Sequence, residues 1–586
     1  MVPNKKQSTE ENNKLEILRH SAAHIMAEAV QSIFPDTKFG IGPAIESGFY
    51  YDFDIPRPLT SDDLPLIEAK MSEIIASDVP FIREEATKEE ARRLFASQPY
   101  KLELIDEISD EKLSLYKQGS FVDLCRGFHV NSTGEIKAFK LISVAGAYWR
   151  GDEQRPMLQR IYGIAFESRK ALAEHLKKLD EAAKSDHRKL GRELGLFSIH
   201  EEAGPGLVHW HPKGAVIRRV IEDFWKDEHI KRGYDVVYTP HIAKVDLWKT
   251  SGHWEFYRDY LYGPMEVEGQ EYIIKPMNCL GHILIYKTEL HSYRELPIRY
   301  AELGTVYRYE RSGVLHGLSR VRGFTQDDAH IFCRFDQLEN EVAGVLDLAL
   351  FMIDTFGFSD YQILLSTQPD KYAGTANLWE EATETLGRAL ARQKLTYAID
   401  PGEGVFYGPK IDIKFRDVVG RAWQGPTIQV DFNLPQRFNV TYIGEDGQEH
   451  SIAMVHRTVL GSMERFLASL IEHYGGTFPV WLAPLQVIVI PVADRHLDYA
   501  HKLEAELKSA GVRVEIDARS ETVSLKIRQA QLNKIPYMLV VGDKEVATST
   551  ISLRLRSGQQ LAPHSLDDLK KYIRIAIANK VKDIKL

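Results

Sequence analysis

The stretch GTVYRYERSGVLHGLSRVRGFTQDDAHIF, residues 304–332, says most about the fold class. It opens with a candidate strand at 305–309 and is unusually rich in arginine for its length. The charged residues of interest are Arg308, Glu310, Arg311, Arg320 and Arg322. A guanidinium offers two parallel N–H bonds that match two oxygens of a phosphate or carboxylate. An isolated Arg-x-Glu pattern is more often a salt-bridged hairpin surface, so this segment alone only suggests an anion site.

A second arginine lies in MVHRTVLGSMERF, residues 454–466, where Gly461 precedes a predicted helix that carries Arg465 on its first turns. Further strands are predicted on both sides of these segments, at 234–238, 297–301, 427–432 and 452–456. They do not alternate regularly with helices, which favours an antiparallel sheet. The chain has no phosphate loop of the form GxxxxGK[ST] and no GxGxxG after a strand, so ATP, if used, is held in another way.

The flanking regions predict separate domains. Residues 1–13 are polar and are expected to be disordered. Apolar residues at helical spacing predict a helix over about 15–34, and a mixed α+β region continues to about 166. The charged segment 167–190 predicts a linker helix. After Pro479, apolar runs at 485–492, 512–517 and 537–543 alternate with helical patterns, which predicts a parallel α/β domain.

Length and composition narrow the class of protein. A chain of 586 residues exceeds the size of a single core, so two to four domains are expected. No apolar stretch is long enough to span a bilayer, and the polar N-terminus shows no signal peptide. Three cysteines are too few for a disulfide framework and suit a reducing cytosol. The net charge of −9 argues against a general nucleic-acid binder.

Taken together, these segments resemble the signature motifs of class II aminoacyl-tRNA synthetases, the helix over about 215–230 with the following strand being similar to the first motif. The similarity extends to the threonyl-tRNA synthetase family through IKPMNCLGH (274–282), RVRGFTQDDAHIF (320–332), FYGPKIDI (406–413) and VHRTVLGSMERF (455–466). The resemblance implies a multidomain α+β protein without the family's N-terminal ubiquitin-like domain. Its implied parts are an α+β editing domain (14–166), the linker helix (167–190), a catalytic domain on a class II antiparallel sheet (191–478) and an α/β anticodon-binding domain (479–586).

The implied activity is activation of L-threonine with ATP and its transfer to tRNA(Thr). In the resemblance, Arg308 holds the α-phosphate and the amino-acid carboxylate, with Glu310 beside it. Arg320 holds the outer phosphates, and Arg465 holds the γ-phosphate. Positioning and charge compensation suffice for this chemistry, and Mg²⁺ accompanies the ATP.

The resemblance also implies one Zn²⁺ per chain, held by Cys279, His330 and His456. Their spacing alone fits a core thiol and two buried imidazoles equally well. Three protein ligands with an open fourth position describe a reactive zinc site, which the amino and hydroxyl groups of threonine can occupy and those of valine cannot. Other residues match positions of the substrate pocket: Gln326, Asp328, Tyr407, Lys410, Gln424 and Gln429. Leu280 departs from the family pattern, which has proline there.

The N-terminal region carries a second group of candidate ligands, in which His20 and His24 share one helix face and Cys125 precedes His129 by four residues. The residues alone allow a four-ligand zinc site. The resemblance instead implies an editing site that hydrolyses mischarged seryl-tRNA(Thr) without metal, with Asp123 and Lys101 at further editing positions. Editing is needed because serine keeps the hydroxyl and lacks only a methyl group, worth about 1–3 kcal/mol. Phe128 stands where the family has proline.

In the C-terminal domain, Glu545 and Arg554 match anticodon contacts of the family, while Ser520 replaces an expected asparagine. The resemblance further implies a homodimer through the first motif, a cytoplasmic location and no membrane contact. Three alternatives fit less well. A class II synthetase for another amino acid is disfavoured by the Cys279, His330 and His456 set, and an RNA-binding regulator that has lost catalysis is disfavoured by the intact Arg308, Arg320 and Arg465. A zinc hydrolase built on the N-terminal cluster lacks an HExxH motif and leaves the rest of the chain unexplained.

Overall fold

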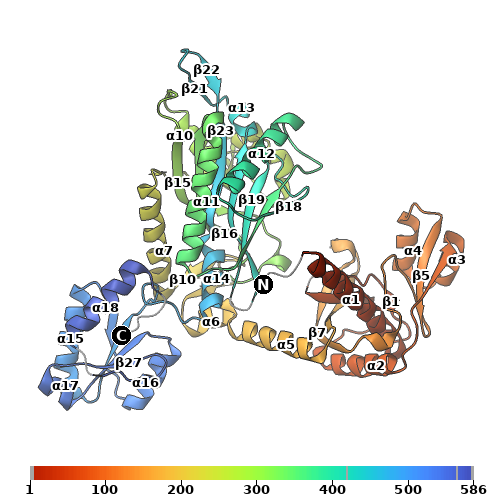
Figure 1. Cartoon of the computed structure of the whole chain (residues 1–586), viewed down its shortest axis with the longest axis horizontal. Helices are drawn as coiled ribbons and strands as arrows, with labels where there is room; N and C mark the ends of the chain where they lie inside the picture. The colour runs from red at the N-terminus through yellow and green to blue at the C-terminus, as the bar shows by residue number, and fades with distance from the viewer. Residues whose placement is uncertain (1–4, 46, 153, 418–419, 563–564, 582–586) are drawn as a thin grey trace. The chain divides into compact units, whose positions relative to one another are not determined.

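The computed structural model describes residues 5–45, 47–152, 154–417, 420–562 and 565–581. The chain forms two compact units that divide after residue 180. Figure 1 shows the first unit in red to orange and the second in yellow to blue.

The first unit is built around helix α1 (Lys5–Ile33), which packs on a five-stranded antiparallel sheet in the order β1-β3-β8-β7 with β2 beside β3. The strands are β1 (Lys38–Phe39), β2 (Ala44–Ile45), β3 (Gly48–Asp54), β7 (Ala138–Tyr148) and β8 (Met157–Phe166). Apolar residues of α1 recur every three or four positions, so one stripe of the helix is buried; it includes Ala22, Ile25, Met26 and Ala29. α2 (Leu64–Ala76) packs beside α1.

A smaller three-stranded sheet completes this unit: β4 (Ile82–Thr87), β5 (Lys112–Gln118) and β6 (Phe121–Leu124). Two helices accompany it, α3 (Lys88–Leu94) and α4 (Pro99–Glu107). α4 carries Lys101, β6 carries Asp123, and Cys125 follows β6 directly. The predicted editing residues therefore come from α1, α4 and the end of β6.

Two expectations about this part of the chain differ from the structure. α1 begins at Lys5, so the backbone of 5–13 is helical where a disordered tail was expected; no glycine or proline there ends the helix, and residues 1–4 lie outside the described residues. The predicted single linker helix is two helices, α5 (Arg169–Lys184) and α6 (His187–Glu193). Asp186 has extended ψ and caps α6 by accepting from the N–H of Arg188, which separates them.

The second unit contains an eight-stranded sheet in the order β11-β15-β16-β23-β20-β19-β17-β18, antiparallel except for the β11–β15 and β17–β18 pairs. Its strands are β11 (Asp235–Val236), β15 (Ile298–Tyr307), β16 (Gly323–Cys333), β17 (Tyr361–Ser366), β18 (Ala398–Asp400), β19 (Lys410–Arg416), β20 (Ala422–Asp431) and β23 (Ala453–Ser462). The predicted antiparallel sheet is confirmed.

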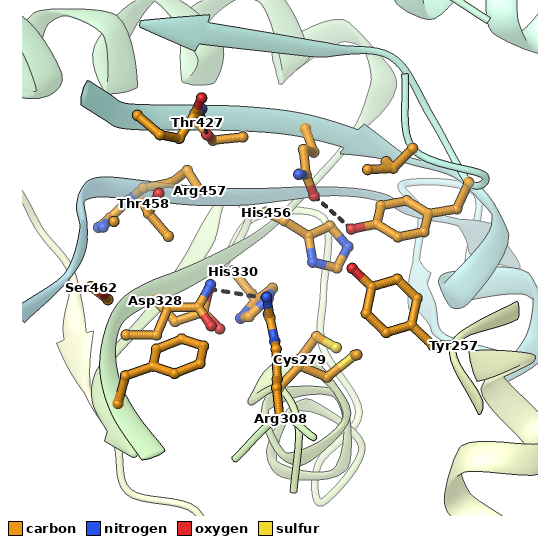
Figure 2. Close-up of a pocket in the computed structure, with 18 of the residues that line it drawn as sticks. Tyr257, Cys279, Arg308, Asp328, His330, Thr427, His456, Arg457, Thr458 and Ser462 are labelled. Carbon is orange, nitrogen blue, oxygen red and sulfur yellow. Dashed lines mark hydrogen bonds and ion pairs between the residues drawn. The ribbon is translucent and has the colours of Figure 1, made fainter. Parts of the chain in front are cut away.

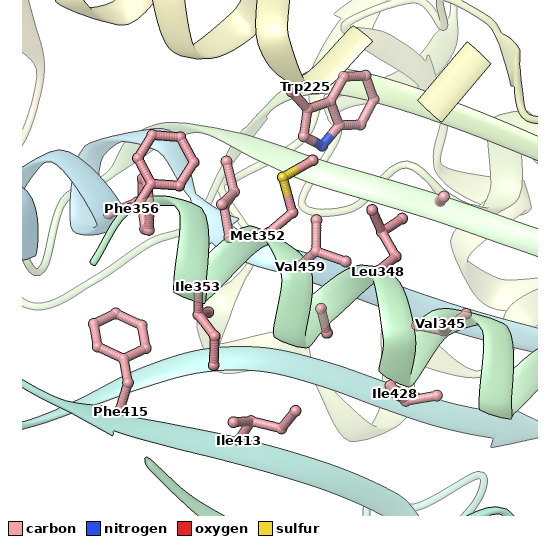
Figure 3. Packing of buried hydrophobic residues seen from close by; sticks show 14 of the residues in the cluster. Trp225, Val345, Leu348, Met352, Ile353, Phe356, Ile413, Phe415, Ile428 and Val459 are labelled. Carbon is pink, nitrogen blue, oxygen red and sulfur yellow. The ribbon is translucent and has the colours of Figure 1, made fainter. Parts of the chain in front are cut away.

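Helices bury one face of this sheet. α11 (Leu338–Thr355) lies along the strands, and its Val345, Leu348 and Met352 belong to the same buried cluster as Trp225 (Figure 3). Three further long helices belong to this part: α7 (Pro212–Lys231), α12 (Ala376–Arg392) and α14 (Met463–Tyr474). Because strand side chains alternate between faces, one set of residues fills this core and the other set faces the opposite side.

Register places the candidate ligands on that opposite face. In the β16–β23 ladder His330 pairs directly with His456, and in the β20–β23 ladder His456 pairs with Gln429. A β-bulge between Gln326 and Asp328 adjusts the preceding residues.

Smaller elements surround the sheet: β9 (Phe197–Ile199), β10 (Val208–Trp210), β12 (Ile242–Lys244), α8 (Val245–Ser251), α9 (His253–Phe256), β13 (Met265–Val267), β14 (Gln270–Ile274), α10 (Cys279–Tyr286), α13 (Asn433–Arg437), β21 (Thr441–Ile443) and β22 (Glu449–Ser451). No helix of the described ranges is long and apolar enough to cross a bilayer.

The C-terminal part has a four-stranded sheet, β25-β24-β26-β27. The strands are β24 (Val487–Pro491), β25 (Val514–Ile516), β26 (Tyr537–Val541) and β27 (Ser552–Leu555), with helices α15 (Leu497–Ser509), α16 (Val523–Leu532), α17 (Asp543–Thr548) and α18 (Leu566–Asn579). The predicted parallel pairing holds for β24 with β25 and β26, while β27 adds an antiparallel edge.

Candidate active site and editing site

A cavity of about 470 Å³ opens on the free face of the eight-stranded sheet. It brings together ten of the residues predicted for the catalytic site: Cys279, Arg308, Gln326, Asp328, His330, Tyr407, Gln424, Gln429, His456 and Arg465. Cys279 is the first residue of α10, and the others come from β15 through β23, the loop before β19 and the start of α14. Residues separated by almost 190 positions in the sequence therefore share one site.

Cys279, His330 and His456 converge at one point of this cavity (Figure 2). One donor atom from each lies within 4.8 Å of those of the other two, and all three side chains are buried. His456 Nε2 donates a hydrogen bond to Asp431 Oδ2 at 2.9 Å. Its Nδ1 is therefore the nitrogen whose lone pair is left to bind a metal. The soft thiol and two imidazoles are the donor set that zinc prefers.

Carboxylates lie close to this trio. Asp328 Oδ1 is 3.7 Å from His330 Nε2, and Asn278 donates to Asp328 Oδ2 at 3.2 Å. Burial, followed by the nearby charges of Asp328 and Asp431, raises the pKa of the Cys279 thiol well above its usual value. Negative charge beside a buried thiol suits a divalent cation, which would stabilise the thiolate.

Positive charge gathers on another side of the same cavity. Arg308 Nε donates to the carbonyl of Pro276 at 3.3 Å, and its guanidinium lies 5.1 Å from the centre of the Phe324 ring. Arg465 Nε donates to the carbonyl of Ser319 at 3.4 Å. Burial lowers the pKa of Arg465, and the charges of Arg308 and Arg320 lower it further. Several guanidinium groups close enough to repel one another form a site for a polyanion.

Three predicted catalytic or substrate residues do not line the cavity. Glu310 and Arg320 form an ion pair at 3.0 Å on the loop between β15 and β16. Lys410 lies on β19 and pairs with Asp412 at 2.9 Å. Asp412 also accepts from Gln424 Nε2 at 2.7 Å, so Lys410 is one residue removed from the wall of the cavity.

Several lining residues were missed by sequence reasoning, among them His253, Tyr257, Phe406 and Thr458. His253 begins the short helix α9, and its Nδ1 lies 2.8 Å from Ser251 Oγ. Burial lowers its pKa to about 4, so the ring is neutral at physiological pH. The segment SGHWEFY shows no periodicity or paired ligand that could have indicated this histidine.

This chain is similar to known proteins over nearly its whole length. Residues 262–474 match the family model for the class II tRNA synthetase core domain (G, H, P, S and T), and 486–575 match the anticodon binding domain. A threonine–tRNA ligase from Dehalococcoides mccartyi (strain BAV1) is 66% identical over 571 residues, which cover 97% of this chain and 98% of the relative. The chain belongs to the threonyl-tRNA synthetase family.

More distant relatives agree. A threonine–tRNA ligase from Nitrosococcus oceani is 56% identical over 567 residues, covering 96% of this chain and 88% of the relative. A solved structure described as the RNA binding domain of threonyl-tRNA synthetase from Cryptosporidium parvum aligns with a TM-score of 0.64 at 40% identity, covering 68% of this chain and 99% of that one. The class II fold and family predicted from the sequence motifs are confirmed.

The family comparison also reaches the N-terminal unit, where 113–162 match the threonyl and alanyl tRNA synthetase second additional domain. Here His20, His24, Cys125 and His129 place one donor atom each within 4.8 Å of one another. Cys125 Sγ lies 3.3 Å from His20 Nε2 and 3.4 Å from His129 Nε2. The structure brings together the two predicted pairs, His20 with His24 and Cys125 with His129.

A buried ion pair lies next to this cluster of three histidines and one cysteine. Lys101 Nζ lies 2.5 Å from Asp123 Oδ1, and Tyr51 donates to Asp123 Oδ2 at 2.5 Å. Asp123 Oδ2 is also 3.7 Å from His24 Nε2. Burial is the largest cause of the lowered pKa of His20, His24 and His129, so the imidazoles are neutral at physiological pH. The site offers a thiol, neutral bases and one buried ammonium.

A third group of ligand-type residues, Asp186, His187 and Glu472, is saturated by hydrogen bonds. His187 Nδ1 donates to Glu472 Oε1 at 2.6 Å, and its Nε2 accepts from the N–H of Leu318 at 3.0 Å. Both ring nitrogens are occupied, so this group ties α6 and α14 to the loop between β15 and β16 rather than offering a site.

The two predicted anticodon residues lie apart from each other in the contacts of the C-terminal part. Glu545 caps α17 by accepting from the N–H of Gly542 at 2.9 Å. Arg554 lies on β27, opposite Met538 of β26. No hydrogen bond or ion pair among the described residues joins them, so their shared role stays a prediction.

Proposed function

We propose that this chain joins L-threonine to tRNA(Thr) using ATP, with zinc at Cys279, His330 and His456, and that its N-terminal unit hydrolyses seryl-tRNA(Thr). It would act as a homodimer in the cytoplasm, with Mg²⁺ bound to the ATP. The observation that carries the proposal is the meeting of a zinc-type donor set and an arginine cluster in one cavity of a threonyl-tRNA synthetase family member.

The arginines supply the activation step. Arg308 and Arg465 line the cavity, and Arg320 acts on Arg465 from the adjoining loop. As the threonine carboxylate attacks the α-phosphorus, charge develops on phosphate oxygens and on the departing pyrophosphate. Preorganised guanidinium groups stabilise that charge without any acid or base. The pairing of Arg320 with Glu310 holds the arginine ready and would be exchanged for the outer phosphates.

Cys279, His330 and His456 would hold the zinc, which would offer its open side to the amino and hydroxyl groups of threonine. Asp328 would accept a hydrogen bond from that hydroxyl, a role that its distance of 3.7 Å from His330 Nε2 supports. Tyr407 and Gln429, joined by a hydrogen bond of 2.5 Å, form the wall beside His456. A site that must engage a hydroxyl rejects valine strongly but admits serine.

Serine carried through this site must be removed elsewhere, and the N-terminal unit holds the groups for it. Neutral imidazoles of His20, His24 and His129 can orient water, and Lys101 can stabilise the oxyanion that forms at the ester carbonyl. Lys101 is held by Asp123 and Tyr51. None of these steps needs a metal ion.

Amino-acid-dependent ATP–pyrophosphate exchange, measured with each of the twenty amino acids together with the zinc content, tests the proposal. Threonine should give the fastest exchange and serine a slower one, with one zinc per chain. Fastest exchange with another amino acid would identify a different class II synthetase, and no exchange at all would favour an RNA-binding regulator. A fully active enzyme without zinc would refute the metal site.

A further inference from the structure

His282 lies outside the cavity lining yet touches one of the candidate zinc ligands. It is on α10, three residues after Cys279, and is fully buried. Its Nδ1 is 2.8 Å from Nδ1 of His330. Its Nε2 is 3.2 Å from Oε2 of Glu302, on the neighbouring strand β15. Each ring nitrogen of His282 therefore has one protein partner, His330 on one side and Glu302 on the other.

Glu302 is surrounded by donors. The N–H of Thr239 donates to Oε1 at 2.9 Å, and the Thr239 hydroxyl donates to Oε2 at 2.8 Å. Lys275 Nζ lies 3.5 Å from Oε1 in an ion pair whose members are both buried. Although burial raises the pKa of Glu302, the bonds from His282 and Thr239 outweigh it, and the pKa is lowered. Glu302 is thus a carboxylate that only accepts hydrogen bonds.

This fixes the protons along the chain of contacts. Because Glu302 only accepts, Nε2 of His282 carries a proton and donates it. With Nε2 of His282 donating to Glu302, its Nδ1 can serve as the acceptor, and the proton between the two rings is then assigned to Nδ1 of His330. Nε2 of His330 is left with a free electron pair on the cavity side, where Cys279 and His456 lie.

We propose that Glu302 and His282, with Lys275 behind them, are positioning residues that fix the tautomer and orientation of His330 as a zinc ligand and so set the zinc affinity. The inference rests on the zinc site of the proposed function and deepens it. Metal-bound histidines generally donate their second N–H to an outer partner, and losing that partner typically weakens metal binding about 10–100-fold.

The arrangement differs from that of the other imidazole ligand. His456 donates directly to a carboxylate, Asp431, over one bond of 2.9 Å. His330 reaches its carboxylate only through His282, which belongs to the same helix as Cys279. α10 therefore supplies one ligand and the support of a second, and three-residue spacing puts both on one face.

The decisive experiment measures zinc affinity of the full-length protein by competition with a chromophoric chelator. His282→Leu keeps an apolar side chain of similar bulk but removes the acceptor, so zinc affinity should fall about 10–100-fold. Glu302→Gln keeps the shape but loses the charge that fixes the proton, and should weaken zinc several-fold. The matched control is His229→Leu, a fully buried histidine of α7 that bonds only to the Trp225 carbonyl; its zinc affinity should stay within about twofold of the parent.

The outcomes separate the inference from the function beneath it. Parent protein without zinc would refute the metal site itself. Parent protein with zinc, and His282→Leu with parental zinc affinity, would refute the positioning role alone. If His282→Leu shows no cooperative unfolding, Glu302→Gln decides, and parental affinity in that variant overturns the inference. A loss of zinc in His229→Leu equal to that in His282→Leu would also overturn it, because the effect would then be general destabilisation.

Discussion

Two clusters of histidine and cysteine, one in each unit, contain almost the same residue types in different surroundings. In the catalytic unit, His330 and His456 each turn one nitrogen away, toward His282 and Asp431, and Asp328 adds negative charge nearby. In the editing unit, His20 and His129 both direct Nε2 at Cys125 Sγ. His24 Nδ1 is buried without a hydrogen-bond partner, and the nearest carboxylate, Asp123, is already paired with Lys101.

The difference shows that residue types do not define a metal site by themselves. A zinc ligand needs a lone pair aimed at the metal, an outer partner on its other nitrogen and a net negative environment. In the catalytic cluster both imidazoles have an outer partner and a carboxylate lies close by. The editing cluster places a buried ammonium beside its ligand-type residues, which disfavours a divalent cation and suits a reaction that forms an oxyanion.

Metal removal should give the largest difference between the two clusters. Removing zinc with a chelator should lower threonine-dependent pyrophosphate exchange by about 10³-fold or more. The reason is that the metal that selects for the threonine hydroxyl is lost. Hydrolysis of seryl-tRNA by the same stripped sample should stay within about twofold of the untreated protein. Exchange should return when zinc is added back. Equal loss of both activities would show that the two clusters are both metal sites.

Arg308→Ala tests the phosphate side of the catalytic cluster. Loss of a charge-assisted fork at the transition state should lower exchange about 10³-fold, several kcal/mol. The control is Arg334→Ala, a half-buried arginine that follows β16, pairs with Asp336 and does not line the cavity; this variant should leave exchange within about twofold. Exchange by Arg308→Ala within tenfold of the parent would mean that the phosphate site is elsewhere.

A double variant of His20→Ala and His24→Ala tests the editing cluster. Removing two groups that orient water should slow seryl-tRNA hydrolysis about 10²-fold, while threonine activation stays nearly unchanged because the two sites belong to separate units and share no side chain. Clearance of seryl-tRNA should be followed with purified mischarged tRNA. A variant that clears it as fast as the parent would remove these histidines from the mechanism.

The smallest effect concerns pH. Burial lowers the pKa of His20, His24 and His129 from the usual 6.5. An imidazole with a lowered folded-state pKa contributes stability that is complete above about 6.5 and is lost as the pH falls toward the folded value. The midpoint temperature of thermal unfolding of the editing unit should therefore drop by roughly a few degrees between pH 7.5 and pH 5. Calorimetry of the double variant should show a smaller drop; an equal drop would mean that other groups titrate.

The sequence predicted those parts of the molecule that sit in long motifs. The segment 304–332 forms the end of β15, the following loop and most of β16, and 454–466 forms most of β23 and the start of α14. Arg308, His330, His456 and Arg465, named from these motifs, all line the cavity, as does Cys279 from the motif 274–282. Their roles stay predictions. The antiparallel sheet followed from strands without helical alternation.

Residues whose roles depend on tertiary neighbours were missed. His253 lines the cavity from a one-turn helix, and Asp431 and Glu302 meet histidines far away in sequence. His282 lies in the motif IKPMNCLGH, and its position three residues after Cys279 on one helix is the sequence signal that could have indicated its role. The extent of α1 and the break before α6 depended on local capping that polarity alone does not reveal.

The direct pairing of His330 with His456 across β16 and β23 has a consequence for how such a gene can change. Strand side chains alternate between faces, so inserting or deleting one codon in either strand would turn one histidine toward the hydrophobic core. A single substitution near the pair keeps both histidines on the same face of the sheet, but a change in the length of either strand does not. Lineages of this protein should therefore gain and lose residues in the loops that flank these two strands, while the strands themselves keep their length.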